Sequence, residues 1–282
     1  MRRFLVATDL SARSDRALER ALILASEYEA ALTIVHVIDE DLPAPLADVQ
    51  QSAAIETISG HVDALTTGIH KNVSIQVVVG RPHSDILEIW RKTEAEMIIL
   101  GMHREDAFKD MFRGTTVERV MRGATVPVLL VKERARSPYQ RVMLGIDFSV
   151  YSRRAVEFAI KFTPNAEFHL VHAYHVPFGG LLYSGDTKRE VSRQHQTRFQ
   201  QMMEEELAEF LTGLEMNASG LEQVMQEGTV REVIYRQVDR FKPELLVIGT
   251  RGRTGVAHAF LGSIAEDLLS APPCDVLAVK SW

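Results

Sequence analysis

Cysteines and long apolar runs are the scarcest features of this sequence. Cys274 is the single cysteine among 282 residues, which excludes an internal disulfide framework and a zinc site built from several thiolates. No apolar run approaches the roughly eighteen residues of a membrane span, and the N-terminal run is closed by Asp9, too early for a secretory leader. A hydrophobic content of 46% and a charged content of 25% are those of a globular protein. We therefore expect a soluble, cytoplasmic protein that does not enter membranes.

An excess of positive charge and the common catalytic motifs are also missing. The chain has 32 Lys and Arg against 38 Asp and Glu, a formal net charge of −6, which argues against nucleic-acid binding but not against a small anionic ligand. There is no Gly-x-Ser-x-Gly elbow, no Walker A lysine and no His-Glu-x-x-His pair. Cys274 is expected to be a small buried residue and not a nucleophile. We predict no catalytic residue and no metal held by side chains alone.

The sequence contains one internal repeat. Residues 7–11 recur 138 positions later, and residues 34–37 recur after 136 positions. Later landmarks are 148 positions apart and pair Gly80 with Gly228, Gly101 with Gly249, Gly114 with Gly262, and Lys132 with Lys280. The change of spacing places about twelve extra residues in the middle of the second half. We expect two homologous lobes, residues 1–135 and residues 139–282.

Each lobe alternates short apolar runs with helical patterns. Strands are predicted at residues 4–8, 32–37, 74–79, 97–100, 128–131, 142–146, 168–173, 221–226, 245–248 and 276–279. Helices are predicted at 11–28, 49–65, 85–93, 115–122, 153–162, 188–211, 231–241 and 263–270, with a loop at 41–45. Apolar strands without polar alternation indicate parallel sheets covered on both faces, a doubly wound α/β fold.

Two features of this pattern carry further expectations. The last strands of the lobes, 128–131 and 276–279, are the expected lobe–lobe contact, because apolar sheet edges need covering. The charged helix at 188–211 is interpreted as a solvated face, and a partner-docking helix is the alternative. Its apolar residues are expected to point inward, and they are Phe199, Met202, Met203, Leu207 and Phe210.

The most specific motif follows the apolar run 245–248. Gly249 is separated by two residues from Gly252, and nine more residues precede Gly262 and Ser263. Glycines let backbone N–H groups approach an anion, because they have no Cβ and tolerate positive φ. We expect Ser263 to cap the next helix in a capping box with Glu266, and a helix N-terminus itself attracts negative charge. The pattern predicts a phosphate-binding loop.

This spacing resembles the nucleotide-binding loop of the universal stress protein family, whose ATP-binding members show it ending in Gly-Ser or Gly-Thr. The resemblance covers essentially the whole chain. It implies a five-stranded parallel sheet of order 3-2-1-4-5 in each lobe, lobes packed about a pseudo-twofold axis, and binding of ATP, with Mg²⁺ carried by the phosphates. It also implies a regulatory or stress-protective role, with the adenine near Ala173 and the phosphates near Ile264. A further homodimer stays open.

Under that strand order the sheet reverses direction between its first and fourth strands, where open α/β sheets bind ligands. Asp147 and Gly249 end these two strands. The Asp147 carboxylate either meets the nucleoside or the metal of the phosphates, or makes an N-cap or Asx-turn, and both roles are compatible. Arg251 and Arg253 either contact phosphate oxygens or are surface arginines. His172 is expected to be a hydrogen-bonded core residue, because His36 recurs at the same place.

The first lobe departs from the motif. Gly101, Gly114 and Thr115 keep the spacing, but Arg104 stands where the second lobe has Gly252. A side chain there disfavours positive φ and close backbone approach, and three carboxylates lie within residues 105–110. Thr115 and Glu118 form a second predicted capping box. The remaining candidates in this lobe, weaker than those of the second, are Asp9, Val37, Gly101, Arg104, Gly114 and Thr115.

We therefore expect ATP mainly in the second lobe, unless Arg104 supplies a charge contact that replaces the lost amide. Three functions remain open at this point. They are an ATP-binding regulator, a slow ATPase or phosphotransfer protein, and an interaction protein that needs no nucleotide. The ATPase would need a base or a water-positioning group, and the sequence does not identify one.

Overall fold

The computed structural model describes residues 2–65, 72–102, 114–175, 198, 201–214, 221–252 and 261–280. The first lobe contains β1 (Arg3–Thr8), α1 (Ala12–Glu27), β2 (Ala31–Asp39), α2 (Ala44–Leu65), β3 (Val73–Gly80), α3 (Pro82–Thr93), β4 (Met97–Gly101), α4 (Thr116–Gly123) and β5 (Val128–Val131). The second contains β6 (Arg141–Ile146), α5 (Val150–Phe162), β7 (Glu167–Tyr174), β8 (Glu222–Glu227), α7 (Val230–Phe241), β9 (Leu245–Gly249), α8 (Ser263–Ser270) and β10 (Asp275–Val279). Residues 201–211 are also helical.

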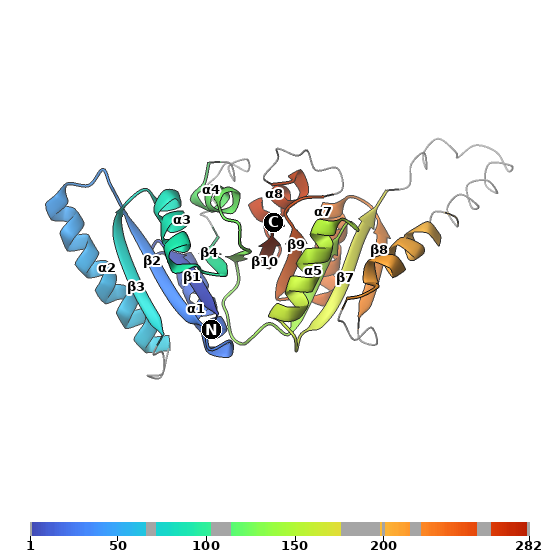
Figure 1. The fold of residues 1–282 in the computed structure, drawn as a ribbon, viewed down its shortest axis with the longest axis horizontal. Helices are drawn as coiled ribbons and strands as arrows, with labels where there is room; N and C mark the ends of the chain where they lie inside the picture. The colour runs from blue at the N-terminus through green and yellow to red at the C-terminus, as the bar shows by residue number, and fades with distance from the viewer. Residues whose placement is uncertain are drawn as a thin grey trace.

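The strands form one ten-stranded sheet in the order β3-β2-β1-β4-β5-β10-β9-β6-β7-β8 (Figure 1). Each lobe therefore has the predicted order 3-2-1-4-5, with parallel neighbours throughout. The lobes join where β5 and β10 pair antiparallel, which confirms the expected contact between the last strands. The predicted doubly wound α/β fold is thus confirmed in both halves.

The register of the β5–β10 pair shows the pseudo-symmetry directly. Leu129 lies opposite Leu277, its own counterpart 148 positions later. The flanking pairs are Val128 with Ala278, the counterpart of Leu130, and Leu130 with Val276, the counterpart of Val128, so the pattern is symmetric about the central pair. An antiparallel pair of equivalent strands is related by a local twofold axis, which here passes beside Leu129 and Leu277.

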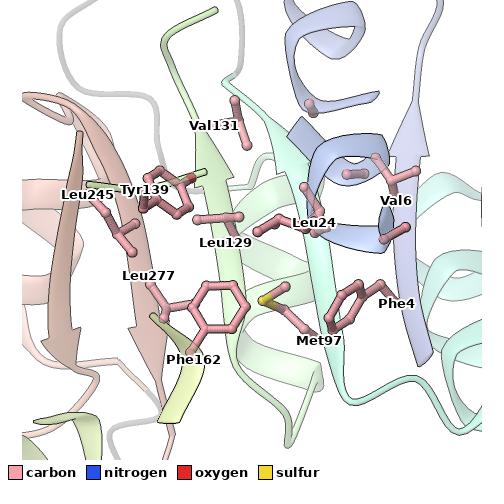
Figure 2. Packing of buried hydrophobic residues seen from close by; sticks show 14 of the residues in the cluster. Phe4, Val6, Leu24, Met97, Leu129, Val131, Tyr139, Phe162, Leu245 and Leu277 are labelled. Atoms are coloured by element: carbon pink, nitrogen blue, oxygen red, sulfur yellow. The ribbon is translucent and has the colours of Figure 1, made fainter. Parts of the chain in front are cut away.

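The core lies on both faces of the sheet and continues across the lobe junction. On one face Leu129 and Leu277 belong to the same buried cluster as Met97 and Phe162, and Figure 2 shows these side chains gathered around the junction. The other face holds a second cluster that also contains residues of both lobes. Alternate residues of each strand serve opposite faces, which explains the continuous apolar runs in the sequence.

The helices after β1 and β6 begin in the same way. Ser11 caps α1 by accepting a hydrogen bond from the Ser14 N–H, and Ser149 caps α5 by accepting one from the Ser152 N–H. One face of each helix is rich in alanine and packs on the sheet. Ala17 and its alanine neighbours in α1 are buried there. These caps fix where each helix leaves the carboxyl end of its strand.

Two local predictions were wrong. The predicted loop at 41–45 is partly helical, because α2 begins at Ala44 and accommodates Pro45 in its first turn, where a proline loses no helical hydrogen bond. In the helix after β7, Met203, Leu207 and Phe210 are buried as predicted, but Met202 is 53% exposed. Phe199 and most of the predicted 188–211 helix lie outside the described residues.

Among the helices that the structure describes, none combines the length and hydropathy required to cross a bilayer.

Candidate functional site

A cavity of about 360 Å³ lies at the carboxyl ends of β6, β7 and β9, at the N-terminus of α8. This is the point in the second lobe where the strand order reverses, as predicted. The predicted residues that line it are Asp147, Ala173, Gly249, Arg251, Gly252, Gly262, Ser263 and Ile264. Arg253 lies outside the described residues. The structure therefore brings the described part of the predicted site together around one cavity.

Asp147 serves the backbone turn with one oxygen and faces the glycine loop with the other. Its Oδ1 accepts hydrogen bonds from the Ser149 N–H at 3.0 Å and the Ser149 hydroxyl at 2.5 Å. A Cβ placed on Gly252 would lie 2.8 Å from Asp147 Oδ2. Asp147 therefore makes the Asx-turn through Oδ1, and its Oδ2 lies beside the glycine loop.

The loop glycines are required by close contacts and not by unusual backbone angles. A Cβ on Gly249 would lie 3.0 Å from the backbone carbon of Tyr151, at the start of α5. None of Gly249, Gly252 and Gly262 uses the positive φ that a glycine tolerates. What the missing side chains permit is the close approach of the loop to α5 and to Asp147.

The start of α8 differs from the prediction. Gly262 is the N-cap, with φ −73° and ψ 153°, and no side chain makes a capping hydrogen bond there. Ser263 is the first helical residue, so its predicted capping box with Glu266 was wrong. The Gly262 N–H donates to the Thr250 carbonyl at 2.8 Å, and this bond holds the start of α8 near the end of β9. The helix therefore starts one residue earlier than a cap at Ser263 would require. Ser263 and Ile264, the first residues of α8, line the cavity, and the N-cap residue has no side chain that could accept from the first-turn N–H groups.

The rest of the cavity is apolar. Val171 and Ala173 of β7 and Ile248 of β9 form one wall, and Val230 and Ile234 of α7 form another. The sequence analysis missed the α7 residues, because their apolar spacing is that of any core-facing helix. It also missed Gly145, Leu261 and Leu268, although the position of Gly145 at a strand end was a usable signal.

His172 has the structural role that was predicted. Its Nδ1 donates to the Ile146 carbonyl at 2.8 Å, and its ring centroid lies 4.3 Å from that of Phe148. His36 makes the same bond to the Thr8 carbonyl at 2.9 Å. Both histidines therefore tie the second strand of a lobe to the end of its first strand.

In the first lobe, side chains of the equivalent helix, α4, accept hydrogen bonds from N–H groups at its N-terminus. Thr115 is the N-cap of α4 and accepts from the Glu118 N–H, as predicted. The Glu118 carboxylate accepts from the Gly114 N–H at 2.5 Å and not from the Thr115 N–H that a capping box requires. Its other oxygen accepts from Arg122 Nε at 2.5 Å, and the side chain is 7% exposed. A buried carboxylate thus occupies the N-terminus of α4.

Among the remaining first-lobe candidates, Asp9 and Gly101 are arranged as their second-lobe counterparts are, whereas Gly114 differs from Gly262 in φ. Asp9 accepts from the Ser11 N–H at 3.0 Å. Burial acts to raise the pKa of Asp9, but hydrogen bonds with Ser11 and Ser14 outweigh it and lower the pKa below 3.8. A Cβ on Gly101 would lie 2.9 Å from the Arg13 carbonyl. Val37 is half-buried on β2, Gly114 has φ +85°, and Arg104 lies outside the described residues.

No group of three or more His, Cys, Asp or Glu side chains converges on a possible metal position in the part of the chain that the structure describes. Cys274 is buried as predicted, and burial raises the pKa of its thiol far above the ordinary value. A buried neutral thiol is a poor nucleophile.

The comparisons with known proteins agree with this architecture. The model of the universal stress protein family matches residues 1–132 and again residues 138–280. Universal stress protein Rv2005c of Mycobacterium tuberculosis is 25% identical over 300 aligned residues, covering 98% of this chain and 96% of the relative.

Two solved structures have the same fold over nearly the whole chain. A universal stress protein from Archaeoglobus fulgidus has a TM-score of 0.68 and 22% identity and covers 99% of this chain and 98% of its own. The protein PA1789 from Pseudomonas aeruginosa, described as functionally unknown, has a TM-score of 0.71 and 19% identity and covers 99% and 92%. With both halves matched by the family model, the chain belongs to the universal stress protein family as a tandem two-domain member.

Proposed function

We propose that this protein binds ATP in its second lobe and acts as a regulatory or stress-protective protein whose state depends on that nucleotide. The observation that carries the proposal is the single cavity in which an apolar pocket, the Asp147 carboxylate and the N-terminus of α8 meet. Its volume of about 360 Å³ lies within the roughly 300–1,000 Å³ usual for small-ligand sites.

Each part of the cavity matches one part of ATP. The apolar walls from β7, β9 and α7 suit the adenine ring, and the Asp147 carboxylate suits ribose hydroxyls as an acceptor. Main-chain N–H groups at Gly252 and in the first turn of α8 suit the phosphates, and the helix dipole adds a favourable field. Arg251 lines the same cavity and adds a positive charge. Any Mg²⁺ would then be carried chiefly by the phosphates.

We favour the second lobe because the N-cap residue of α8 is Gly262, which has no side chain, whereas the N-cap residue of α4 is Thr115, whose side chain accepts from the Glu118 N–H. In the first lobe the buried Glu118 carboxylate accepts from the Gly114 N–H, one of the amides that a phosphate would use. Bringing a polyphosphate to that carboxylate would set like charges against each other in a partly dry site. Arg122 pairs with Glu118 and holds its carboxylate beside the Gly114 N–H. The second lobe has Glu266 at the position equivalent to Glu118, but Ser270 in place of the arginine.

A matched pair of substitutions tests the proposal. Asp147→Asn and Asp9→Asn remove the same carboxylate from equivalent Asx-turns, so both should cost similar stability. In isothermal titration with Mg-ATP, we expect Asp147→Asn to weaken binding by about tenfold, because an acceptor for the ribose hydroxyls is lost. Asp9→Asn should leave the affinity within about twofold. Equal losses in the two variants, or a loss only in Asp9→Asn, would contradict the assignment to the second lobe.

A further inference from the structure

The last strand of each lobe is followed by a lysine that reaches the other lobe. Lys280 follows β10 of the second lobe, and its Nζ donates to the carbonyls of Arg122 and Ala124 at 2.8 and 2.6 Å. Lys132, its counterpart 148 positions earlier, follows β5, and its Nζ donates to the Pro273 carbonyl at 3.1 Å. The two lysines therefore make reciprocal contacts across the pseudo-twofold axis.

The contact that Lys280 makes is at the C-terminus of α4. Ala124 is the C-cap residue of this helix, and Arg122 lies in its last turn. The last carbonyls of a helix have no partner within the helix, and the negative end of the helix dipole lies there. A lysine that carries its proton supplies both hydrogen-bond donors and positive charge, whereas a neutral lysine supplies donors alone. The charge of Lys280 therefore affects how firmly the second lobe holds a helix of the first.

Lys280 also lies next to the proposed nucleotide site. Gly249 pairs with Val279 in the parallel β9–β10 ladder, and the Thr250 N–H donates to the Val279 carbonyl at 3.1 Å. Arg251 and Lys280, which come next in the two chain segments, therefore leave the sheet at the same edge. Arg251 lines the nucleotide cavity, and its positive charge acts on the Lys280 ammonium group. Lys280 thus stands between the cavity of one lobe and α4 of the other.

The surroundings of Lys280 disfavour its charged form. Burial, together with the positive charges of Arg251 and Arg122, lowers the pKa of Lys280 to about 8. Arg122 belongs to the first lobe and pairs with Glu118 at 2.5 Å, so a ligand in the second lobe leaves this pair as it is. Arg251 belongs to the nucleotide site, so a ligand there changes its effect on Lys280.

Other charged side chains lie along the same side of the molecule. They line, with Lys280, a cavity of about 840 Å³ whose walls come from both lobes. They come from the end of α3, the start of β4 and α5, and they are Arg91, Glu94, Glu96, Arg154, Glu157 and Lys161. None of these six lines the nucleotide cavity. Of the charged groups named around Lys280, Arg251 is therefore the one that a bound nucleotide would neutralise.

We propose that Lys280 takes up a proton when the phosphates of a nucleotide bind beside Arg251, and that it then holds α4 of the first lobe more firmly. This inference rests on the nucleotide binding proposed above. Phosphate oxygens that pair with Arg251 offset its charge and bring negative charge close to Lys280, which favours the ammonium form. The occupancy of one lobe is thereby passed to a helix of the other.

Isothermal titration of the full-length protein with Mg-ATP at pH 8 tests the proton uptake. The titration is run in Tris and in HEPES, two buffers with different ionisation enthalpies, so that the difference in heat counts protons. We expect an uptake of about half a proton per ATP, because half of the Lys280 side chains are neutral at a pKa of about 8. The phosphates themselves contribute little at this pH, because their second pKa is about 6.

Two substitutions assign the proton to Lys280. Lys280→Arg keeps a charge that does not titrate, and Lys280→Met has no charge, so the uptake should fall below about a tenth of a proton in both. An uptake of half a proton also makes the affinity depend on pH. The Kd for Mg-ATP should rise about threefold between pH 8 and pH 9 in the unmodified protein and stay constant in both variants. An uptake that persists in Lys280→Arg would overturn the proposal.

Hydrogen exchange of residues 116–124 tests the link to the first lobe. At pH 8, Mg-ATP should slow the exchange of these α4 amides about twofold in the unmodified protein and not in Lys280→Met. Equal slowing in both proteins, or none in either although ATP is bound, would overturn the link. ATP binding without proton uptake would overturn this proposal and leave the proposed function intact, whereas the absence of ATP binding would overturn both.

Discussion

At the scale of single residues, Asp9 and Asp147 make the same turn in different surroundings. Each accepts a hydrogen bond from the serine N–H two residues later, at 3.0 Å. Asp147 Oδ2 also faces Gly252, whereas the first lobe has Arg104 in place of that glycine. The difference between the lobes therefore lies in what surrounds the carboxylate and not in the carboxylate itself.

Lys280 provides a prediction about pH. Burial, together with the nearby Arg251 and Arg122, lowers the pKa of Lys280 to about 8. Between about pH 8 and the ordinary value of 10.5, the unfolded chain therefore holds more protons than the folded one, and this group makes stability rise with pH.

Comparison with Lys280→Met isolates that effect. Urea unfolding at pH 7, 8, 9 and 10 should show the free energy of unfolding of the unmodified protein gaining on that of the variant as pH rises. Below about pH 7 the difference between the two should be constant, because Lys280 is then charged in both states. A difference that falls or stays constant between pH 8 and 10 would contradict the lowered pKa.

At the scale of elements, a glycine inside α2 provides a prediction about stability. Gly60 lies in the middle of α2, and a Cβ added there would have no atom within 4 Å. A helical glycine without a packing reason costs roughly 0.5–1 kcal/mol relative to alanine. Gly60→Ala should therefore raise the free energy of unfolding by about that amount, as measured by urea denaturation. A loss of stability would show that α2 packs differently from the structure described here.

Most elements could be predicted because their signals are local. The apolar run 128–131 and the helix 263–270 coincide with β5 and α8, and the serine caps appear in the sequence as Ser11 and Ser149. The start of α8 was harder, because it depends on a hydrogen bond from the Gly262 N–H to the Thr250 carbonyl, which no local pattern encodes. The α7 wall of the cavity also depends on tertiary packing, which periodicity does not encode.

At the scale of the whole molecule, a buried polar network fastens the two lobes together. Asp275 of β10 is fully buried and accepts from the Lys132 and Glu133 N–H groups at 2.8 and 2.9 Å and from the Tyr139 hydroxyl. Arg20 Nε of the first lobe lies 3.5 Å from Oδ2, the oxygen that also accepts from Tyr139, and the Arg20 side chain is 4% exposed. Burial raises the pKa of Asp275, against the effect of these donors. The network is present on only one side of the pseudo-twofold axis, because Phe158 stands at the position equivalent to Arg20, and Pro127 stands at the position equivalent to Asp275.

Removal of Asp275 should be costly. Asp275→Ala leaves the Arg20 charge and several donors buried without their partner, which costs about 3–5 kcal/mol in comparable cases. The control is Asp267→Ala, which breaks the exposed pair with Arg231 and should cost at most about 1 kcal/mol. Urea denaturation of the two variants provides the comparison. A similar small change in both would mean that the network does not hold the lobes.

The central claim is that one of two similar lobes holds the nucleotide. Native mass spectrometry of the full chain with Mg-ATP measures this most directly, because it counts bound ligands per chain. We expect one ATP per chain, and a smaller bound fraction at the same concentration for Gly252→Ala, whose new Cβ, 2.8 Å from the present position of Asp147 Oδ2, would displace that carboxylate. Two equivalent ATP molecules per chain, or one that persists undiminished in Gly252→Ala, would contradict the account.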